Sequence, residues 1–154
     1  FFDVACNFFC DLTADDIKPD GWYPFSAFDD IYKAVYESPG GSSALVAVGK
    51  ASATQLVSVE TTRTGENWLE NILPAEPFTF TRNVPEGYGF LVEKSGEGEY
   101  RFTNNTGIPN DLIFGYLWEG LRILIPHSQN FRVAPLHGYS RDSKEGAVFE
   151  VTWG

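Results

Sequence analysis

The sequence predicts a mostly β protein: an antiparallel β-sandwich, or a flattened barrel, with one amphipathic helix near the N-terminus. Residues 26–37 carry helical hydrophobic spacing. From residue 44 onward, short apolar or β-branched runs alternate with Gly, Pro and Asn turns, which is typical of strands. The 154 residues show no repeat and no linker, so we expect a single domain, residues 1–154, with its own hydrophobic core.

Residues 1–24 are expected to form an N-terminal extension and a loop, because acids, Pro, Gly and aromatics follow one another there without a period. Cys6 and Cys10 are the only cysteines, and both two buried thiols and a local disulfide are open. Asn104 begins a candidate N-glycosylation triplet. Because no Met begins the chain, a removed leader or a start within a longer chain is open, and we expect a secreted protein.

The helix at 26–37 is expected to begin at a capping box made by Ser26 and Asp29. Ser38-Pro39-Gly40-Gly41 would end it. Its apolar face follows three- and four-residue spacing and consists of Phe25, Phe28, Tyr32, Val35 and Tyr36.

The remaining residues, 44–154, are expected to form the β-sandwich. The Gly-containing segment 95–98 predicts a hairpin turn. The runs 112–118 and 121–125 are continuously apolar, as in strands buried on both faces, and Glu119-Gly120 between them is interpreted as a two-residue turn. The expected strands are 44–50, 55–61, 78–81, 88–94, 99–103, 112–118, 121–125, 131–133 and 147–153.

Charge and motifs exclude several function classes. The chain has 21 acidic and 11 basic residues, a net charge of −10, so we expect no nucleic-acid partner. The apolar N-terminus is interrupted by Asp3 and Asn7, so no transmembrane segment is expected. Since nucleophile-elbow, P-loop and dinucleotide motifs are absent, we expect no enzyme, although a hydrolase built on Ser128, a histidine and Asp142 is open.

No cofactor is expected from the sequence. His127 and His137 lack a neighbouring third ligand of the kind that a metal site needs. A calcium site is open, because hard cations bind clustered carboxylates, although the EF-hand order is not met. The candidate calcium ligands are Asp11, Asp15, Asp16 and Asp20.

A series of short motifs follows in order along residues 25–154. After the helix come Val57-Ser58-Val59-Glu60 and then Thr64-Gly65-Glu66-Asn67-Trp68, with its Gly-containing turn and Trp. A proline-led entry into an apolar strand follows at 84–91, and a later apolar run ends at Pro126. In this order the motifs resemble the actinoporin-like superfamily of sandwich cytolysins. The resemblance implies membrane binding through the region after Pro126, where this chain lacks the family's Tyr- and Trp-rich cluster.

We therefore expect a secreted, non-enzymatic protein that engages membrane lipid or cell-surface headgroups, such as a pore-forming cytolysin. Loop aromatics also stack on sugars, so a lectin is the first alternative, and a structural or self-assembling subunit, as a homo-oligomer, is the second. The candidate binding residues are Trp22, Tyr23, Trp68, Pro126, His127, Phe131 and Tyr139. The helix residues Phe25, Phe28, Tyr32, Val35 and Tyr36 are the candidates for membrane insertion.

Overall fold

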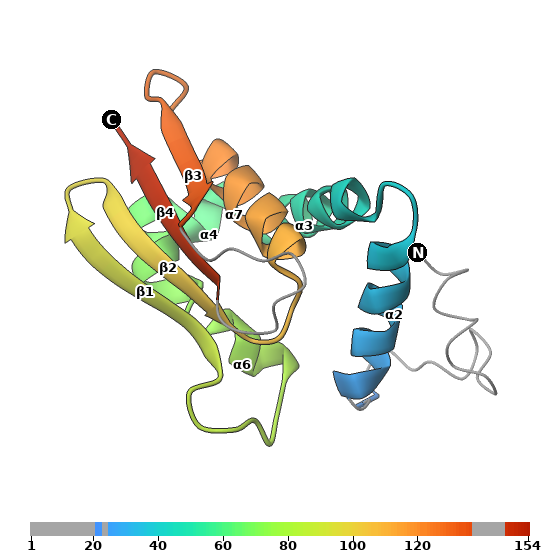
Figure 1. The fold of residues 1–154 in the computed structure, drawn as a ribbon. Coiled ribbons are helices and arrows are strands. Elements are labelled where there is room, and N and C mark those ends of the chain that lie inside the picture. The colour runs from blue at the N-terminus through green and yellow to red at the C-terminus, as the bar shows by residue number, and fades with distance from the viewer. Residues whose placement is uncertain (1–20, 23–24, 137–146) are drawn as a thin grey trace. The chain divides into compact units, whose positions relative to one another are not determined.

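The computed structural model describes residues 21–22, 25–136 and 147–154, with the backbone alone for residues 25–27. The chain divides into two compact units, residues 1–44 and residues 45–154. The second unit contains a four-stranded sheet and most of the helices (Figure 1).

The first unit contains helix α2, Phe25–Glu37, and the start of α3, Gly41–Leu56. The helix expected at 26–37 corresponds to α2. Gly41 allows the tight turn between the two helices, because a Cβ there would lie 2.0 Å from the carbonyl oxygen of Val35. Ile31 is buried on the apolar face of α2, and the sequence interpretation of that face had left it out.

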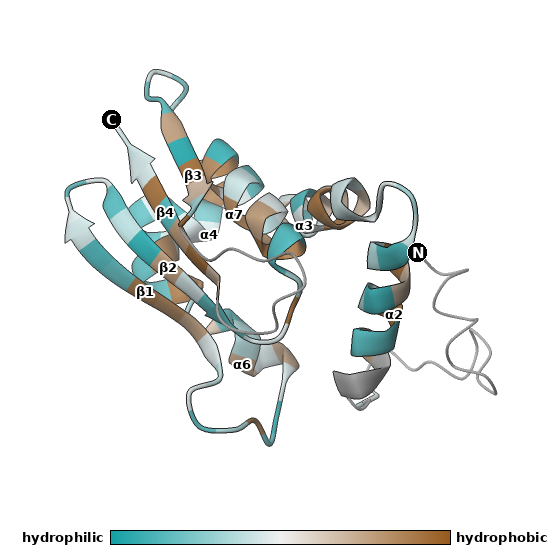
Figure 2. Ribbon diagram, viewed as in Figure 1, coloured by the Kyte–Doolittle hydropathy of each residue, from teal (hydrophilic) through white to brown (hydrophobic). Residues whose placement is uncertain are grey.

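The sheet of the second unit is antiparallel, with the strand order β1-β2-β4-β3. The strands are β1 (Gly89–Gly96), β2 (Glu99–Asn105), β3 (Phe131–Pro135) and β4 (Ala147–Trp153). Polar and apolar residues alternate along β2 and β4 (Figure 2). One face of the sheet is therefore buried, and the other, with Leu91, Arg101 and Glu150, is exposed.

The helices of the second unit cover the buried face of the sheet (Figure 1). Helix α7, Asn110–Leu124, packs against β3, while η2, Trp68–Ile72, and α6, Glu76–Phe80, pack against β1. The short helices α4, Val59–Thr62, and α5, Gly65–Asn67, contact α7. The largest fully buried side chains of this core are Trp68, Tyr100, Phe102, Phe149, Leu69, Leu73, Leu117 and Leu121.

Two glycines let α3 and α7 approach backbone to backbone. A Cβ at Gly49 would lie 2.0 Å from the carbonyl oxygen of Leu112, and one at Gly115 would lie 2.2 Å from that of Val46. Any side chain at either position would push the helices apart. These glycines therefore serve helix packing, and not the turns that glycines in strand-rich sequences mark.

The expected mostly β fold is wrong, and so is the β-sandwich at 44–154. Residues 44–50 lie in α3, 55–61 fall in the end of α3 and in α4, and 78–81 overlap α6. The runs 112–118 and 121–125 form one helix, α7, in which Glu119-Gly120 lies mid-helix. The strands expected at 88–94, 99–103, 131–133 and 147–153 correspond to β1 to β4. The physical reason for the error in α7 is that a helix in contact with other elements on several sides is as continuously apolar as a buried strand.

Candidate functional site

The helical segment at 65–72 ends in a π-helical turn. Thr64 caps its start, because the Thr64 Oγ1 accepts a hydrogen bond from the backbone N–H of Asn67 at 3.1 Å. Within η2 the backbone hydrogen bonds span five residues, as in a π-helix, and not the four of an α-helix. The N–H of Leu73 donates to the carbonyl oxygen of Trp68, five residues earlier, at 2.8 Å. Isolated π-turns are rare and are frequent at functional sites, so this turn and the side chains around it form the candidate site.

On its inner side the turn carries the buried Trp68 and Tyr116 together with the half-buried Glu76, called the Glu76 cluster below. The Trp68 indole is fully buried and lies against Gly120, where a Cβ would come within 2.2 Å of its Cη2. The Trp68 Nε1 donates to the Glu76 Oε1 at 3.4 Å, and the Tyr116 hydroxyl donates to the Glu76 Oε2 at 2.7 Å. The cluster thus joins η2, α6 and α7 through one carboxylate.

Burial is the largest cause of the pKa shifts in the Glu76 cluster. Burial raises the pKa of the Glu76 carboxyl above its usual value, and the hydrogen bonds from Tyr116 and Trp68 offset part of that effect. Burial likewise raises the pKa of Tyr116, and the neighbouring Glu76 raises it further. Tyr116 therefore stays a protonated donor whenever Glu76 is ionised.

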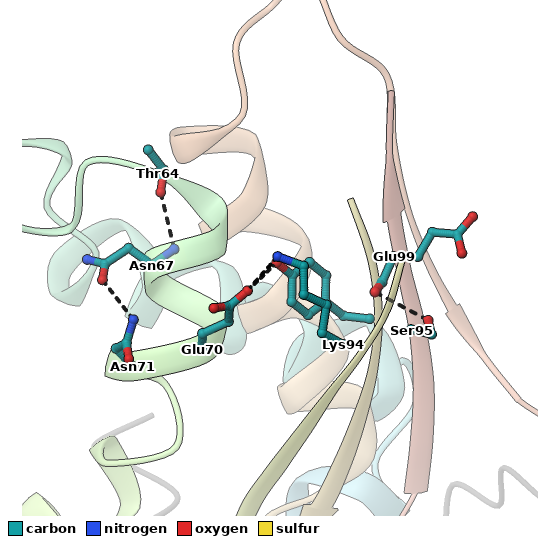
Figure 3. Close-up of polar contacts among 8 residues, drawn as sticks. Thr64, Asn67, Glu70, Asn71, Lys94, Ser95 and Glu99 are labelled. Carbon is teal, nitrogen blue, oxygen red and sulfur yellow. Dashed lines mark hydrogen bonds and ion pairs between the residues drawn. The ribbon is translucent and has the colours of Figure 1, made fainter. Parts of the chain in front are cut away.

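On its outer side the turn carries a second carboxylate, Glu70, which reaches toward Lys94 on the neighbouring strand (Figure 3). The Tyr100 hydroxyl donates to the Glu70 Oε1 at 2.7 Å, and the Lys94 Nζ donates to the same oxygen at 3.0 Å. Glu70, Lys94 and Tyr100 are called the Glu70 cluster below. It links η2 to β1 and β2.

In the Glu70 cluster the pKa of the carboxyl is shifted in the opposite direction to that of Glu76. The hydrogen bond from Tyr100, followed by that from Lys94, holds the pKa of the Glu70 carboxyl below its usual value. Burial and the hydrogen bond to Glu70 raise the pKa of Tyr100 to about 12. The hydrogen bond to Glu70 also raises the pKa of Lys94. At neutral pH the cluster is therefore a carboxylate held by two protonated donors.

The candidate glycosylation residue lies in a buried turn at the end of β2. Asn104 is 3% exposed, and its Nδ2, the atom that would carry a glycan, donates to the carbonyl oxygen of Ile108 at 2.8 Å and to Asn110 Oδ1 at 3.0 Å. Its Oδ1 accepts from the Thr106 hydroxyl at 2.7 Å. A glycan on Asn104 would break these bonds, so the folded chain disfavours it.

The candidate binding aromatics do not gather at one place. Trp68 is in the core, while Trp22 is 51% exposed outside any helix or strand. Pro126 and His127 are exposed after α7, and Phe131, in β3, is half-buried with its ring 5.6 Å from that of Trp118.

In α2, Phe28 is 39% exposed and Tyr32, Val35 and Tyr36 are half-buried. Tyr23, Tyr139 and the side chain of Phe25 lie outside the described residues.

The candidate calcium and disulfide residues all belong to the first 20 residues of the chain. Asp11, Asp15, Asp16, Asp20, Cys6 and Cys10 all lie outside the described residues. Within the described ranges, no three His, Cys, Asp or Glu side chains lie together as a metal site would need. The helices described there are also too short or too polar to cross a membrane.

Sequence reasoning missed Glu70, Glu76, Lys94, Tyr100 and Tyr116, the polar residues of the two clusters. Each cluster joins residues from elements far apart in the chain, so no local spacing could have identified them. One signal was available: Thr64 precedes Asn67 by three residues, as a helix cap does, and this would have placed Trp68 in a helix.

Comparison with known proteins gives structural neighbours but no sequence relatives. No family model matches the chain, and no curated protein matches it. Solved structures of heme NO/oxygen-binding (H-NOX) domains do match in fold. A single-site mutant of the T. tengcongensis H-NOX aligns with a TM-score of 0.68 and 10% identity, over 99% of this chain and 86% of that one. The IWP-051-bound H-NOX from Shewanella woodyi, in its Fe(II)CO state, aligns with a TM-score of 0.62 and 15% identity, over 97% and 82%.

These neighbours correct four expectations. The resemblance to actinoporin-like cytolysins is wrong, because the neighbours are H-NOX domains. A membrane-binding cytolysin, a lectin and a self-assembling structural subunit are therefore wrong as functions, and lipid or glycan headgroups are wrong as partners. The expectation of no cofactor, with calcium left open, is wrong for this fold, since its solved examples include heme proteins. The first three errors follow from reading helices as strands, and the fourth follows from the lack of a local set of metal ligands in the sequence.

A heme iron is held in proteins through His, Cys, Met or Tyr, and the described residues offer few of these. The chain has no Met, and the one imidazole within the described residues, His127, is exposed. The hydroxyls of Tyr100 and Tyr116 already donate to carboxylates, and their raised pKa values oppose ligation as tyrosinate. Of the other described tyrosines, Tyr32 and Tyr36 are half-buried in α2, and the Tyr88 hydroxyl is buried with no hydrogen-bond partner. Among the described residues, Tyr88 is therefore the phenol that a heme iron could use, and no thiolate or buried imidazole is present there.

The remaining imidazole and thiols, His137, Cys6 and Cys10, lie outside the described residues, as do the phenols Tyr23 and Tyr139. Identity of 10–15% to the neighbours supports a statement about fold alone. Along almost its whole length, this chain has the fold of the H-NOX domains.

Proposed function

We propose that this chain is a sensor domain that binds heme and, through it, a diatomic gas. The observation that carries the proposal is the fold, which matches H-NOX domains over 97–99% of this chain with TM-scores of up to 0.68. A match that includes both units and the sheet is not the chance likeness of one helix pair. Because fold alone does not fix function, the proposal needs a direct test of binding.

The proposal places the iron ligand among few side chains. His137 is the first candidate, since an imidazole is a common heme ligand and the chain's other histidine, His127, is exposed. Cys6 and Cys10 are the second candidates, as thiolates. The axial ligand sets the electronics of the iron, so its identity is visible in the absorption spectrum.

The test is a titration of the purified, heme-free chain with hemin, followed by the Soret band. We expect saturable binding of one hemin per chain and a shift of the band when the reduced complex is exposed to CO. His137→Ala should weaken binding or change the spectrum, whereas His127→Ala is the matched control and should leave both unchanged. Cys6→Ser and Cys10→Ser test the thiolates in the same way.

Absence of saturable hemin binding would overturn the proposal. So would equal binding by His137→Ala, Cys6→Ser and Cys10→Ser with one unchanged spectrum, because hemin would then be held without any of the three proposed ligands. Three expectations from the sequence belong with this proposal and are untested: that the chain is not an enzyme, that it is secreted, and that it forms a homo-oligomer.

A further inference from the structure

The π-helical turn at Trp68–Ile72 is held from two sides by different means. A π-turn is less favourable than the α-helical alternative, so it persists where surrounding contacts impose it. Here the hydrogen bond from the Leu73 N–H to the Trp68 carbonyl oxygen, at 2.8 Å, defines the widened register. The question is which contacts maintain that register.

The inner contacts fix the start of the turn. The Trp68 ring lies 5.7 Å from that of Tyr116, and the indole occupies the space that Gly120 leaves. Leu69 and Leu73 are fully buried beside it. Close-packed side chains of this kind do not change position without opening the core. The inner side therefore has one arrangement as long as the unit is folded.

The outer contacts are of another kind, because they are polar and near solvent. The side chains of Glu70 and Lys94 are 40% and 49% exposed, so their ion pair at 3.0 Å is open to water and salt. Tyr100 is 1% exposed as a residue, stacks on Trp153 at 5.1 Å between ring centroids, and donates to Glu70 from this fixed position. Tyr100 is thus a rigid donor, and Glu70 is the movable partner.

We propose that the Glu70 cluster holds the turn in its π register, and that its opening lets the backbone hydrogen bonds of residues 69–73 open locally while the side chains of Trp68, Leu69 and Leu73 stay packed in the core. Glu70 lies inside the turn, and Lys94 and Tyr100 lie on β1 and β2, so closing the cluster fixes the turn against the sheet. Breaking it removes the outer restraint and leaves the inner one. The turn then opens and closes locally within the second unit, and Glu70, Lys94 and Tyr100 act as positioning residues. The inference stands whether or not the chain binds heme.

The test is hydrogen exchange measured by mass spectrometry, together with the amide and Cα chemical shifts of residues 68–73. Glu70→Gln and Tyr100→Phe each weaken the cluster without changing the volume of the side chain greatly. Glu66→Gln is the matched control, because Glu66 is an exposed glutamate one turn earlier in the same helical segment. The heme-free chain is used, so the outcome is separate from that of the hemin titration.

We expect exchange within 69–73 to rise at least about fivefold in Glu70→Gln and in Tyr100→Phe, with shift changes confined to that segment. Exchange in α7 and in β4 should be unchanged, and Glu66→Gln should match the original chain. Unchanged exchange at 69–73 in both cluster variants would overturn the inference. An equal rise in α7 and β4 would overturn it too, because the cluster would then serve the stability of the whole unit.

Discussion

The Glu76 cluster and the Glu70 cluster are both built on a glutamate that binds a tyrosine hydroxyl, but their surroundings differ. In each, a glutamate near η2 accepts a tyrosine hydroxyl at 2.7 Å. Around Glu76 the second donor is the buried Trp68 indole, whereas around Glu70 it is the half-exposed Lys94 ammonium. Burial without a cation raises the pKa of Glu76, and hydrogen bonds with little burial lower that of Glu70.

This difference indicates that the two clusters, on the two sides of the turn, have different roles. Even a half-buried carboxylate such as that of Glu76 is unfavourable without hydrogen-bond partners, so the Glu76 cluster should matter for stability. An exposed ion pair contributes little to stability but responds to its environment. The inner cluster thus anchors η2, and the outer cluster sets its local conformation.

The largest loss of stability should come from removing the Trp68 side chain. Trp68→Ala deletes a fully buried indole and one donor to Glu76, and we expect a loss of about 3–5 kcal/mol in the free energy of unfolding. Urea unfolding followed by circular dichroism measures it. Phe80→Ala is the control, since that ring is 59% exposed and its loss should change stability by about 0.5 kcal/mol or less. Equal effects of the two substitutions would contradict the placement of Trp68 in the core.

The two tyrosines give a matched pair of substitutions. Tyr116→Phe leaves the half-buried Glu76 with the Trp68 donor alone, and we expect a loss of about 1–3 kcal/mol by the same unfolding measurement. Tyr100→Phe should cost less, because Glu70 retains Lys94 and has access to water. A larger loss of stability in Tyr100→Phe than in Tyr116→Phe would contradict these different roles of the two clusters.

The opposite pKa shifts predict opposite pH dependences. The folded pKa of Glu70 is below its ordinary value of 4.5, so its contribution is present above that value and is lost as the pH falls through the folded pKa. The folded pKa of Glu76 is above 4.5, so its contribution is present below that value and is lost as the pH rises through the folded pKa. Unfolding of the original chain, Glu70→Gln and Glu76→Gln across the acidic range measures both.

Relative to Glu70→Gln, the original chain should gain stability as the pH rises through the acidic range. Relative to Glu76→Gln it should lose stability over a higher range of pH. Slopes of the same sign for both comparisons would show that the two carboxyls have similar environments, against the structure.

The smallest effect is expected at Lys94. Lys94→Gln removes an exposed ion pair and leaves the hydrogen bond from Tyr100 to Glu70, so stability should change slightly at low salt and not at all at high salt. Thermal unfolding at two salt concentrations measures this difference. A large effect that persists at high salt would place the pair in a less exposed environment than the structure gives it.

Whether an element could be predicted from the sequence depended on how its buried and exposed residues are distributed. The strands of the sheet expose one face, so 99–103 and 147–153 alternate and were recognised as β2 and β4. Helix α7 is buried at Ile113, Tyr116, Leu117, Leu121 and Leu124, which follow helical spacing along one face, but half-buried apolar residues between them hid that spacing.

The candidate site was beyond local sequence reasoning for a different reason. Tyr100 meets Glu70, and Tyr116 meets Glu76, only through tertiary packing. Gly120 was interpreted as a turn residue, although its role is to admit the Trp68 ring, a role that depends on a residue 52 positions away in the sequence. Trp68 was assigned to a loop because of the neighbouring Gly65, whereas it is fully buried in the core.

The measurement that tests the central claim most directly is the absorption spectrum of the purified chain titrated with hemin, reduced and exposed to CO. A sensor domain of this fold should bind one hemin per chain, and its Soret band should shift with CO. A titration that never saturates, or a reduced complex whose band does not respond to CO, would contradict the proposed function.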